Sequence, residues 1–201
     1  MDNIYDSKSA FLKIMEEADL GSFSEVINDG TIFVNENNQV VFTVLEKETT
    51  FVKLGINSVE NESKSEYIVG FSVLFVGEQK ANKLSAFALM EYIANDNLAP
   101  LETLEYVTRI KALQLKNSLK IAVNDIFNIG EKRAFIRNNI LISDGLPQRF
   151  TDGLLVEIVG KKVDDDEPID SSIISISVSD FYLILAQFGF SKKVDMEPSD
   201  A

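Results

Sequence analysis

The chain has no histidine, no cysteine and no tryptophan among its 201 residues. Without cysteine there is no disulfide, no thiolate nucleophile and no zinc–thiolate site. Without histidine there is no Ser-His-Asp or Cys-His catalytic set, and the commonest ligand of zinc, copper and iron is missing. Acid–base chemistry would have to use carboxylates, lysine or tyrosine, and a metal would need oxygen ligands. These absences favour a non-enzymatic protein and predict no catalytic, cofactor-binding or metal-binding residue.

Long hydrophobic runs are also missing. The longest apolar tracts, residues 71–76 and 181–186, are far shorter than the ~20 apolar residues of a membrane span. The first 20 residues carry charges throughout and contain no signal-peptide core. The ten glycines form neither GxGxxG nor GxxxxGK[ST], so these phosphate-binding loops are absent. We therefore expect a soluble, cytoplasmic protein.

Hydrophobic spacing in the first two thirds of the chain alternates between helical and strand periods. Gly21 is expected to stop the first helix, residues 35–38 to form a hairpin turn, and Pro100 to lie in the first turn of the longest helix. That longest helix carries two apolar stripes, and a break into two shorter helices near Gln114 is the alternative. The predicted helices are 7–20, 80–95 and 101–127, and the predicted strands are 31–34, 39–45, 50–56 and 66–76.

The last third is predicted to return to β structure from Glu131. Asn138-Asn139 is interpreted as a turn, and Asp152-Gly153 as a hairpin turn. Residues 180–188 are a short helix or a last strand, and residues 191–201 are expected to be a mobile acidic tail. The predicted strands here are 134–136, 140–142, 154–159 and 171–178.

The resulting order, α-ββββ-αα-ββββ-α, predicts an α+β fold with largely antiparallel sheets and a central long helical segment. Residues 1–190 are expected to form one domain, or two lobes, 1–78 and 131–190, joined by helices at 80–127. No internal repeat is visible in the sequence. The predicted core residues are Phe71, Val73, Phe75, Leu84, Phe87, Leu115, Leu119 and Ile126.

Two motifs resemble functional sites but have simpler interpretations. The carboxylates of residues 164–167 could bind a hard cation. They lack the alternation and the glycine of an EF-hand, so we interpret them as a solvated loop. Ser143-Asp144-Gly145 and Thr151-Asp152-Gly153 have no base or oxyanion hole beside them, and we interpret both as Asx-type turns.

Charge is segregated along the chain. The net charge is −13, yet residues 109–149 contain eight basic and only three acidic residues, including all four arginines. Internal pairing on a solvated face is one explanation, with Glu105 and Arg109 spaced for an i,i+4 pair. Contact with an acidic protein surface is another. Nucleic-acid binding is disfavoured by the net charge. The candidate partner-contact residues are Arg109, Lys116, Lys120, Arg133, Arg137 and Arg149.

These features favour a protein that acts through protein–protein contacts, by self-association or as a subunit or accessory factor of a larger assembly, such as a phage virion. One alternative is an acidic inhibitor, immunity protein or chaperone that masks a basic partner. A second alternative is a carboxylate-based, metal-dependent enzyme.

Overall fold

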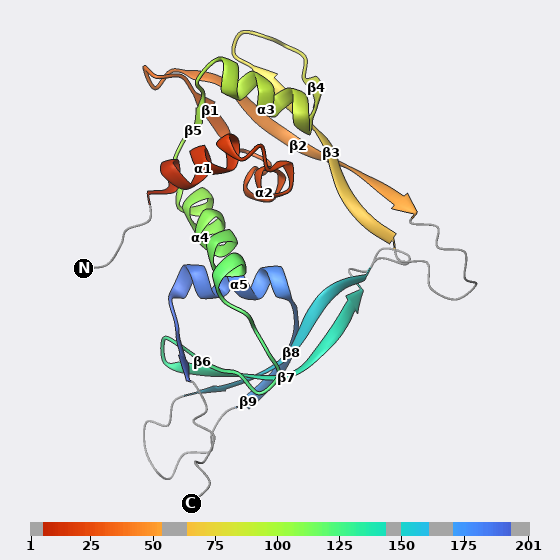
Figure 1. Cartoon of the computed structure of the whole chain (residues 1–201), viewed down its shortest axis with the longest axis vertical. Coiled ribbons are helices and arrows are strands. Elements are labelled where there is room, and N and C mark those ends of the chain that lie inside the picture. Colours follow the sequence, from red (N-terminus) through yellow and green to blue (C-terminus); the bar gives the residue numbers. More distant parts are fainter. Residues whose placement is uncertain (1–5, 54–63, 144–149, 161–170, 194–201) are drawn as a thin grey trace, which may run out of the picture. The chain divides into compact units, whose positions relative to one another are not determined.

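The computed structural model describes residues 6–53, 64–143, 150–160 and 171–193. It has an α+β fold with five helices and two five-stranded antiparallel sheets (Figure 1). The chain forms two compact units, Met1–Leu113 and Gln114–Ala201. The boundary lies inside helix α4 (Leu104–Ser118). None of the described helices is long and apolar enough to cross a membrane.

The first unit packs helices against one face of a sheet whose strand order is β4-β3-β2-β1-β5. Its core is rich in aromatic rings, with Phe11, Phe23, Phe33, Phe42 and Phe71 fully buried. Helical residues of α1, α2, α3 and α4 complete this core. The elements are α1 (Ser7–Glu16), α2 (Leu20–Val26), β1 (Ile32–Val34), β2 (Val40–Lys53), β3 (Lys64–Phe75), β4 (Asn82–Ser85), α3 (Ala86–Asn95) and β5 (Ala99–Pro100).

The second unit has a sheet with strand order β10-β6-β7-β8-β9 and a single helix, α5, across one face (Figure 1). Phe181 and Leu185 of α5 are buried, as are Phe127, Ile136 and Val156 of the sheet. The elements are β6 (Ile126–Ile129), β7 (Lys132–Ser143), β8 (Phe150–Gly160), β9 (Ser171–Ser177), α5 (Val178–Phe188) and β10 (Ser191–Lys193).

The two units repeat one arrangement. In each, four strands form a meander, a helix follows the fourth strand directly, and a fifth strand returns to pair with the first. Ser85 and Ser177 cap the two helices, each accepting a hydrogen bond from the backbone N–H three residues later. Asn97 and Gly189, both with positive φ, then turn the chain into the fifth strand.

The repeat extends to individual backbone hydrogen bonds. Gly30 and Asn124, both with positive φ, donate to the carbonyl oxygens of Val44 and Ile136 at 2.7 and 2.8 Å. A bulge follows Val44 in β2 and Ile136 in β7. Further on, Gly70 lies opposite the capping Ser85, and Gly153 lies opposite the capping Ser177.

Sequence reasoning missed this internal repeat because few side chains are retained between the units. The first strands share only Ile32-Phe33 and Ile126-Phe127, and the glycines and capping serines are the other identities named above. Loops of different length separate these positions, so no fixed sequence period links them.

Several predicted boundaries are wrong for identifiable reasons. The first helix ends at Glu16 because Ala18 adopts positive φ and Asp19 caps α2, which places Gly21 inside a helix. Residues 82–85 form β4, and the helix begins only after Ser85. Pro100 lies in β5 and pairs with Phe33. The predicted central long helix is α4 alone, which runs unbroken through Gln114, and Ile126 begins β6.

Two predicted turns lie inside strands. Asn138-Asn139 follows the bulge within β7, and Asp152-Gly153 pairs with β7 from within β8. Residues 180–188 are helical, and residues 191–193 of the expected tail form β10. The hairpin turn at 35–38 is confirmed, with Asn38 at positive φ. The rest of the tail and residues 164–167 lie outside the described residues.

The predicted core is confirmed in part. Phe71 and Val73 are fully buried, and Phe75 and Leu84 are partly buried against the first unit's core. Leu115, Leu119 and Ile126 are half-buried. The prediction that Phe87 is buried is wrong, because this residue is 63% exposed while its neighbours Ala86 and Leu89 face the core.

Candidate interaction surface

The six predicted contact residues do not all lie in the same unit. Arg109 belongs to the first unit, and Lys116, Lys120, Arg133 and Arg137 belong to the second. Arg149 lies outside the described residues.

The side chain of Arg109 forms its ion pair within the first unit. Its Nη2 donates to Glu105 Oε1 at 3.2 Å, and its side chain is 31% exposed. Its Nε is buried without a hydrogen-bond partner among the described residues.

Lys47 is a second cation of the first unit and lies on the core face of β2. Its Nζ donates a hydrogen bond to the carbonyl oxygen of Ser24 at 2.7 Å, near the C-terminal end of α2. Burial, with the charge of Arg109, lowers the pKa of Lys47 to about 8.

Lys116 and Lys120 lie at the end of α4 and just after it, and both are exposed. The carbonyl oxygen of Lys120 accepts a hydrogen bond from Lys192 Nζ at 3.3 Å. Nearby, the hydroxyl of Tyr182 donates to the carbonyl oxygen of Leu119 at 2.6 Å, which ties the end of α4 to α5. Burial raises the pKa of this tyrosine.

Arg133 and Arg137 are brought together on the face of the second sheet that lies away from α5. This face is called the outer face below. Directly opposed residues of antiparallel strands point to the same side of a sheet. One outer row consists of Lys193, Ile126, Phe135, Glu157 and Ile173, and the next consists of Ser191, Asn128, Arg133, Val159 and Ser171.

Arg137 reaches this face through the bulge in β7. Its Nε donates to Glu157 Oε2 at 2.6 Å, and its guanidinium lies 5.1 Å from the ring centroid of Phe135. The ion pair holds the guanidinium against the ring. Arg133 is exposed in the neighbouring outer row, and Ile173 is 65% exposed at the end of the row that holds Phe135.

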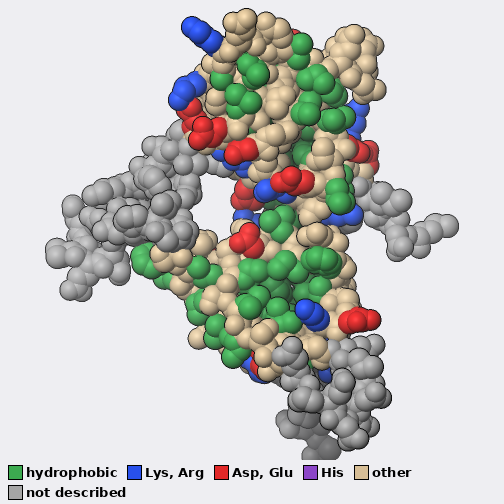
Figure 2. Space-filling view, turned by 180° about the vertical axis from the view of Figure 1, so that it is seen from behind, with side chains coloured by type: hydrophobic (Ala, Val, Ile, Leu, Met, Phe, Trp, Pro, Cys, Tyr) green, Lys and Arg blue, Asp and Glu red, His purple; other side chains and the backbone are tan. Residues whose placement is uncertain are grey.

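The outer face therefore combines half-buried apolar side chains with arginines. The cations of its two outer rows and the bulge are Arg133, Arg137 and Lys193, and the single carboxylate there is Glu157. Aromatic residues and arginine are enriched in protein interfaces. In the view of Figure 2, hydrophobic side chains gather over the lower part of the molecule, which holds α5 together with β6–β9.

The equivalent face of the first unit has the opposite character. The register aligns Glu46, Ser72 and Lys83 across β2, β3 and β4, and places Glu48 opposite Gly70. Lys83 forms an ion pair with Glu48. Thr43 occupies the position that Phe135 holds in the second unit, because both residues directly precede the last buried residue before the bulge. The repeat therefore identifies the basic and aromatic residues as specific to the second unit.

Sequence reasoning missed Ile126, Phe135, Ile173 and Lys193 as members of this surface. Ile126 was expected in the core, and Lys193 in a mobile tail. Residues 132–137 read KRAFIR, with two cations before three apolar residues and a third cation after them, so no period-2 alternation marked the two faces of this strand.

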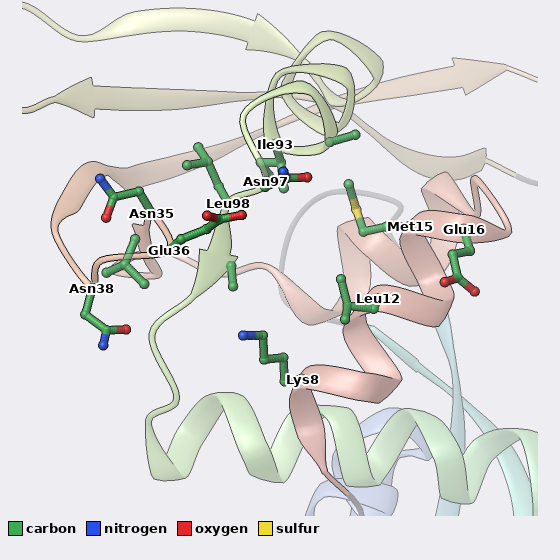
Figure 3. A pocket seen from close by; sticks show the side chains of 13 residues that line it. Lys8, Leu12, Met15, Glu16, Asn35, Glu36, Asn38, Ile93, Asn97 and Leu98 are labelled. Atoms are coloured by element: carbon green, nitrogen blue, oxygen red, sulfur yellow. The ribbon is translucent and has the colours of Figure 1, made fainter.

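A cleft of about 430 Å³ lies in the first unit between α1, the β1–β2 turn and the end of α3 (Figure 3). Leu12, Met15 and Leu98 give it an apolar lining, and Lys8, Glu16 and Glu36 contribute its charges. Its asparagines serve the local backbone: Asn35 Oδ1 accepts from the N–H groups of Asn37 and Gln39, and Asn97 has positive φ.

No group of three or more acidic side chains within the described ranges is arranged to hold a metal ion. Comparison of the chain with protein-family models, with curated proteins and with solved structures finds no match.

Proposed function

We propose that this protein is a non-enzymatic subunit or accessory factor of a larger assembly, and that it binds an acidic protein surface through the outer face of its second sheet. The observation that carries the proposal is the gathering of Arg133, Arg137 and Lys193 around the row Ile126–Phe135–Ile173 on a face that α5 leaves uncovered. Bidentate arginine–carboxylate bonds would supply specificity, and the apolar row would supply buried area.

The internal repeat supports the proposal. Both units need the same buried positions to fold, so the residues of the outer face are free to differ between them. In the first unit this face carries glutamates with one lysine, and in the second it carries arginines and an aromatic ring. Retaining like charges on one face is unfavourable unless an opposite charge meets them, and exposed ion pairs within a monomer contribute only ~0–1 kcal/mol each.

The charge of the partner separates this proposal from a masking function. An inhibitor or chaperone that covers a basic protein would bind through acidic residues. The surface described above is basic, so the expected partner is acidic.

The test is affinity capture from an extract of the source cells, with the intact chain as bait and mass spectrometry as the readout. The test variant is Arg133→Glu with Lys193→Glu, since both side chains are exposed on the outer face. The control is Lys80→Glu with Lys111→Glu, which makes the same change in net charge at exposed sites of the first unit.

We expect an acidic partner that is captured by the parent and by the control, and lost with the test variant. The loss should be greatest at low ionic strength, below the ~0.1 M at which the screening length falls to ~10 Å. Equal capture by both variants at every salt concentration would refute the outer face as the contact surface. A captured partner that is basic would favour the masking function.

A further inference from the structure

The four outermost strands of the two sheets differ in how they are protected against pairing with another chain. Natural proteins shield such edges with short strands, charged residues, proline or bulges. In the first unit β5 has two residues and includes Pro100, and β4 has four residues and includes Lys83. In the second unit β10 has three residues and includes Lys192 and Lys193.

β9 has none of these protections. Its seven residues, SSIISIS, include no charge and no proline, and it pairs with β8 in a regular register without a bulge. No described strand pairs with β9 on the side away from β8. Ile173 is 65% exposed there, and Ser172 and Ser175 are exposed as well.

The internal repeat makes the contrast specific. β4 and β9 hold the same position in the two units, because each follows the third strand and ends in the serine that caps the next helix. Counting back from Ser85 and Ser177, Lys83 corresponds to Ser175. The same edge is therefore charged and short in the first unit, and uncharged and longer in the second.

We propose that β9 pairs with β9 of a second copy of this chain, antiparallel and centred on Ile174, so that the two second-unit sheets join into one. The sequence of β9 is suited to self-pairing. About Ile174, Ser171 meets Ser177 of the other copy, Ser172 meets Ile176, and Ile173 meets Ser175. No like charges meet, and the two-fold axis closes the interface on itself.

This pairing gives hydrogen-bond partners to the backbone N–H and C=O groups on the free edge of β9. It also keeps both α5 helices on the same side of the joined sheet. It also places two outer faces side by side, so that a dimer would present two contact surfaces for an acidic assembly. The pairing shares Ile173 with that surface but uses none of its cations, because Arg133, Arg137 and Lys193 lie outside β9.

The test is the mass of the chain in solution by sedimentation equilibrium, from low to high micromolar concentration. The test variant is Ser172→Lys with Ser175→Lys, which installs at Ser175 the residue that β4 has at Lys83. The control is Ser172→Thr with Ser175→Thr, which keeps the edge uncharged with residues that favour strands. Circular dichroism during heating shows whether each variant is folded.

We expect the parent and the control to approach twice the chain mass of 22.4 kDa, and the lysine variant to remain at 22.4 kDa while it still melts in a cooperative transition. A parent that stays at 22.4 kDa throughout, or a lysine variant that still dimerises, would overturn the proposal. If the lysine variant does not fold, hydrogen exchange of the parent decides the matter. The amides of β9 should exchange more slowly as the concentration rises, and exchange independent of concentration overturns the proposal.

Two further outcomes have distinct meanings. A chain that is monomeric alone, but whose β9 amides become protected when a captured partner is added, would assign this edge to an extended segment of that partner and overturn pairing with a second copy. Arg133→Glu with Lys193→Glu should leave the dimer mass unchanged. Its failure to bind an acidic partner is therefore separable from a failure of β9 pairing.

Discussion

Replacing Phe71 by alanine tests the position of the first unit's core. The ring is fully buried, and its centroid lies 5.9 Å from that of Phe23 in an edge-to-face arrangement. Truncating a buried phenylalanine costs ~3–5 kcal/mol through lost transfer energy and the cavity left behind. The edge-to-face contact accounts for ~0.5–1.5 kcal/mol of what is lost. We therefore expect a loss near the middle of that range, about 4 kcal/mol.

The assay is urea denaturation followed by far-ultraviolet circular dichroism. With a urea dependence of about 2 kcal/mol per molar, this loss lowers the midpoint of the first unit's transition by about 2 M. Phe87→Ala is the matched control, since it removes the same ring from a helix of the same unit where the side chain is 63% exposed. Its expected effect is within about 0.5 kcal/mol. A Phe87→Ala loss equal to that of Phe71→Ala would refute the burial assignments of both residues.

The repeated glycines and the half-buried Lys47 give two further predictions. Gly70→Ala should cost ~1–3 kcal/mol, because the added Cβ would lie 2.5 Å from the backbone oxygen of Leu84. Gly153→Ala should cost less, because its Cβ would lie 2.3 Å from the side chain of Ile142, which can move, and 3.3 Å from the nearest backbone atom, the oxygen of Ile140. Urea midpoints check this order, and a larger loss for Gly153→Ala would contradict it. The pKa of Lys47 is lowered in the folded chain to about 8 from 10.5. Between these two pH values the unfolded state therefore binds a proton that the folded state lacks, and stability rises with pH. Relative to Lys47→Met, the free energy of unfolding of the parent's first unit should increase from pH 8 to pH 10.5, and the difference between the two proteins should stay constant below pH 8. A constant difference across the whole pH range would show that Lys47 keeps its ordinary pKa.

The α+β class and the main strands were predictable because period-2 alternation is strong in this chain. Phe71 and Val73 alternate with Ser72 and Leu74, and the first pair is fully buried. The wrongly predicted turns lie where asparagine, aspartate or glycine is compatible both with a turn and with an irregular strand. Asn138-Asn139 and Asp152-Gly153 have the composition of turns, yet they lie within paired strands because a bulge and a close strand approach use the same residues.

The candidate surface was only half predictable. Charge counting found Arg133 and Arg137, but it treated residues 109–149 as one surface, although the chain passes from a helix of one unit to a sheet of another within that segment. The apolar members of the outer face were invisible to charge counting. The unprotected edge of β9 becomes apparent only when β4 is recognised as its counterpart.

The two repeated sheets fill their buried positions with side chains of unequal size. Where the first unit has Phe42 and Phe71, the equivalent positions in the second hold Ala134 and Leu154. Alanine and leucine side chains bury less apolar area than phenylalanine rings, so we expect the second unit to have the lower intrinsic stability. The chain should therefore unfold in two steps, with the second unit opening first and a single free energy of unfolding undefined for the whole. A partner that binds only the folded second unit would raise that first transition alone, so its melting temperature would depend on partner concentration.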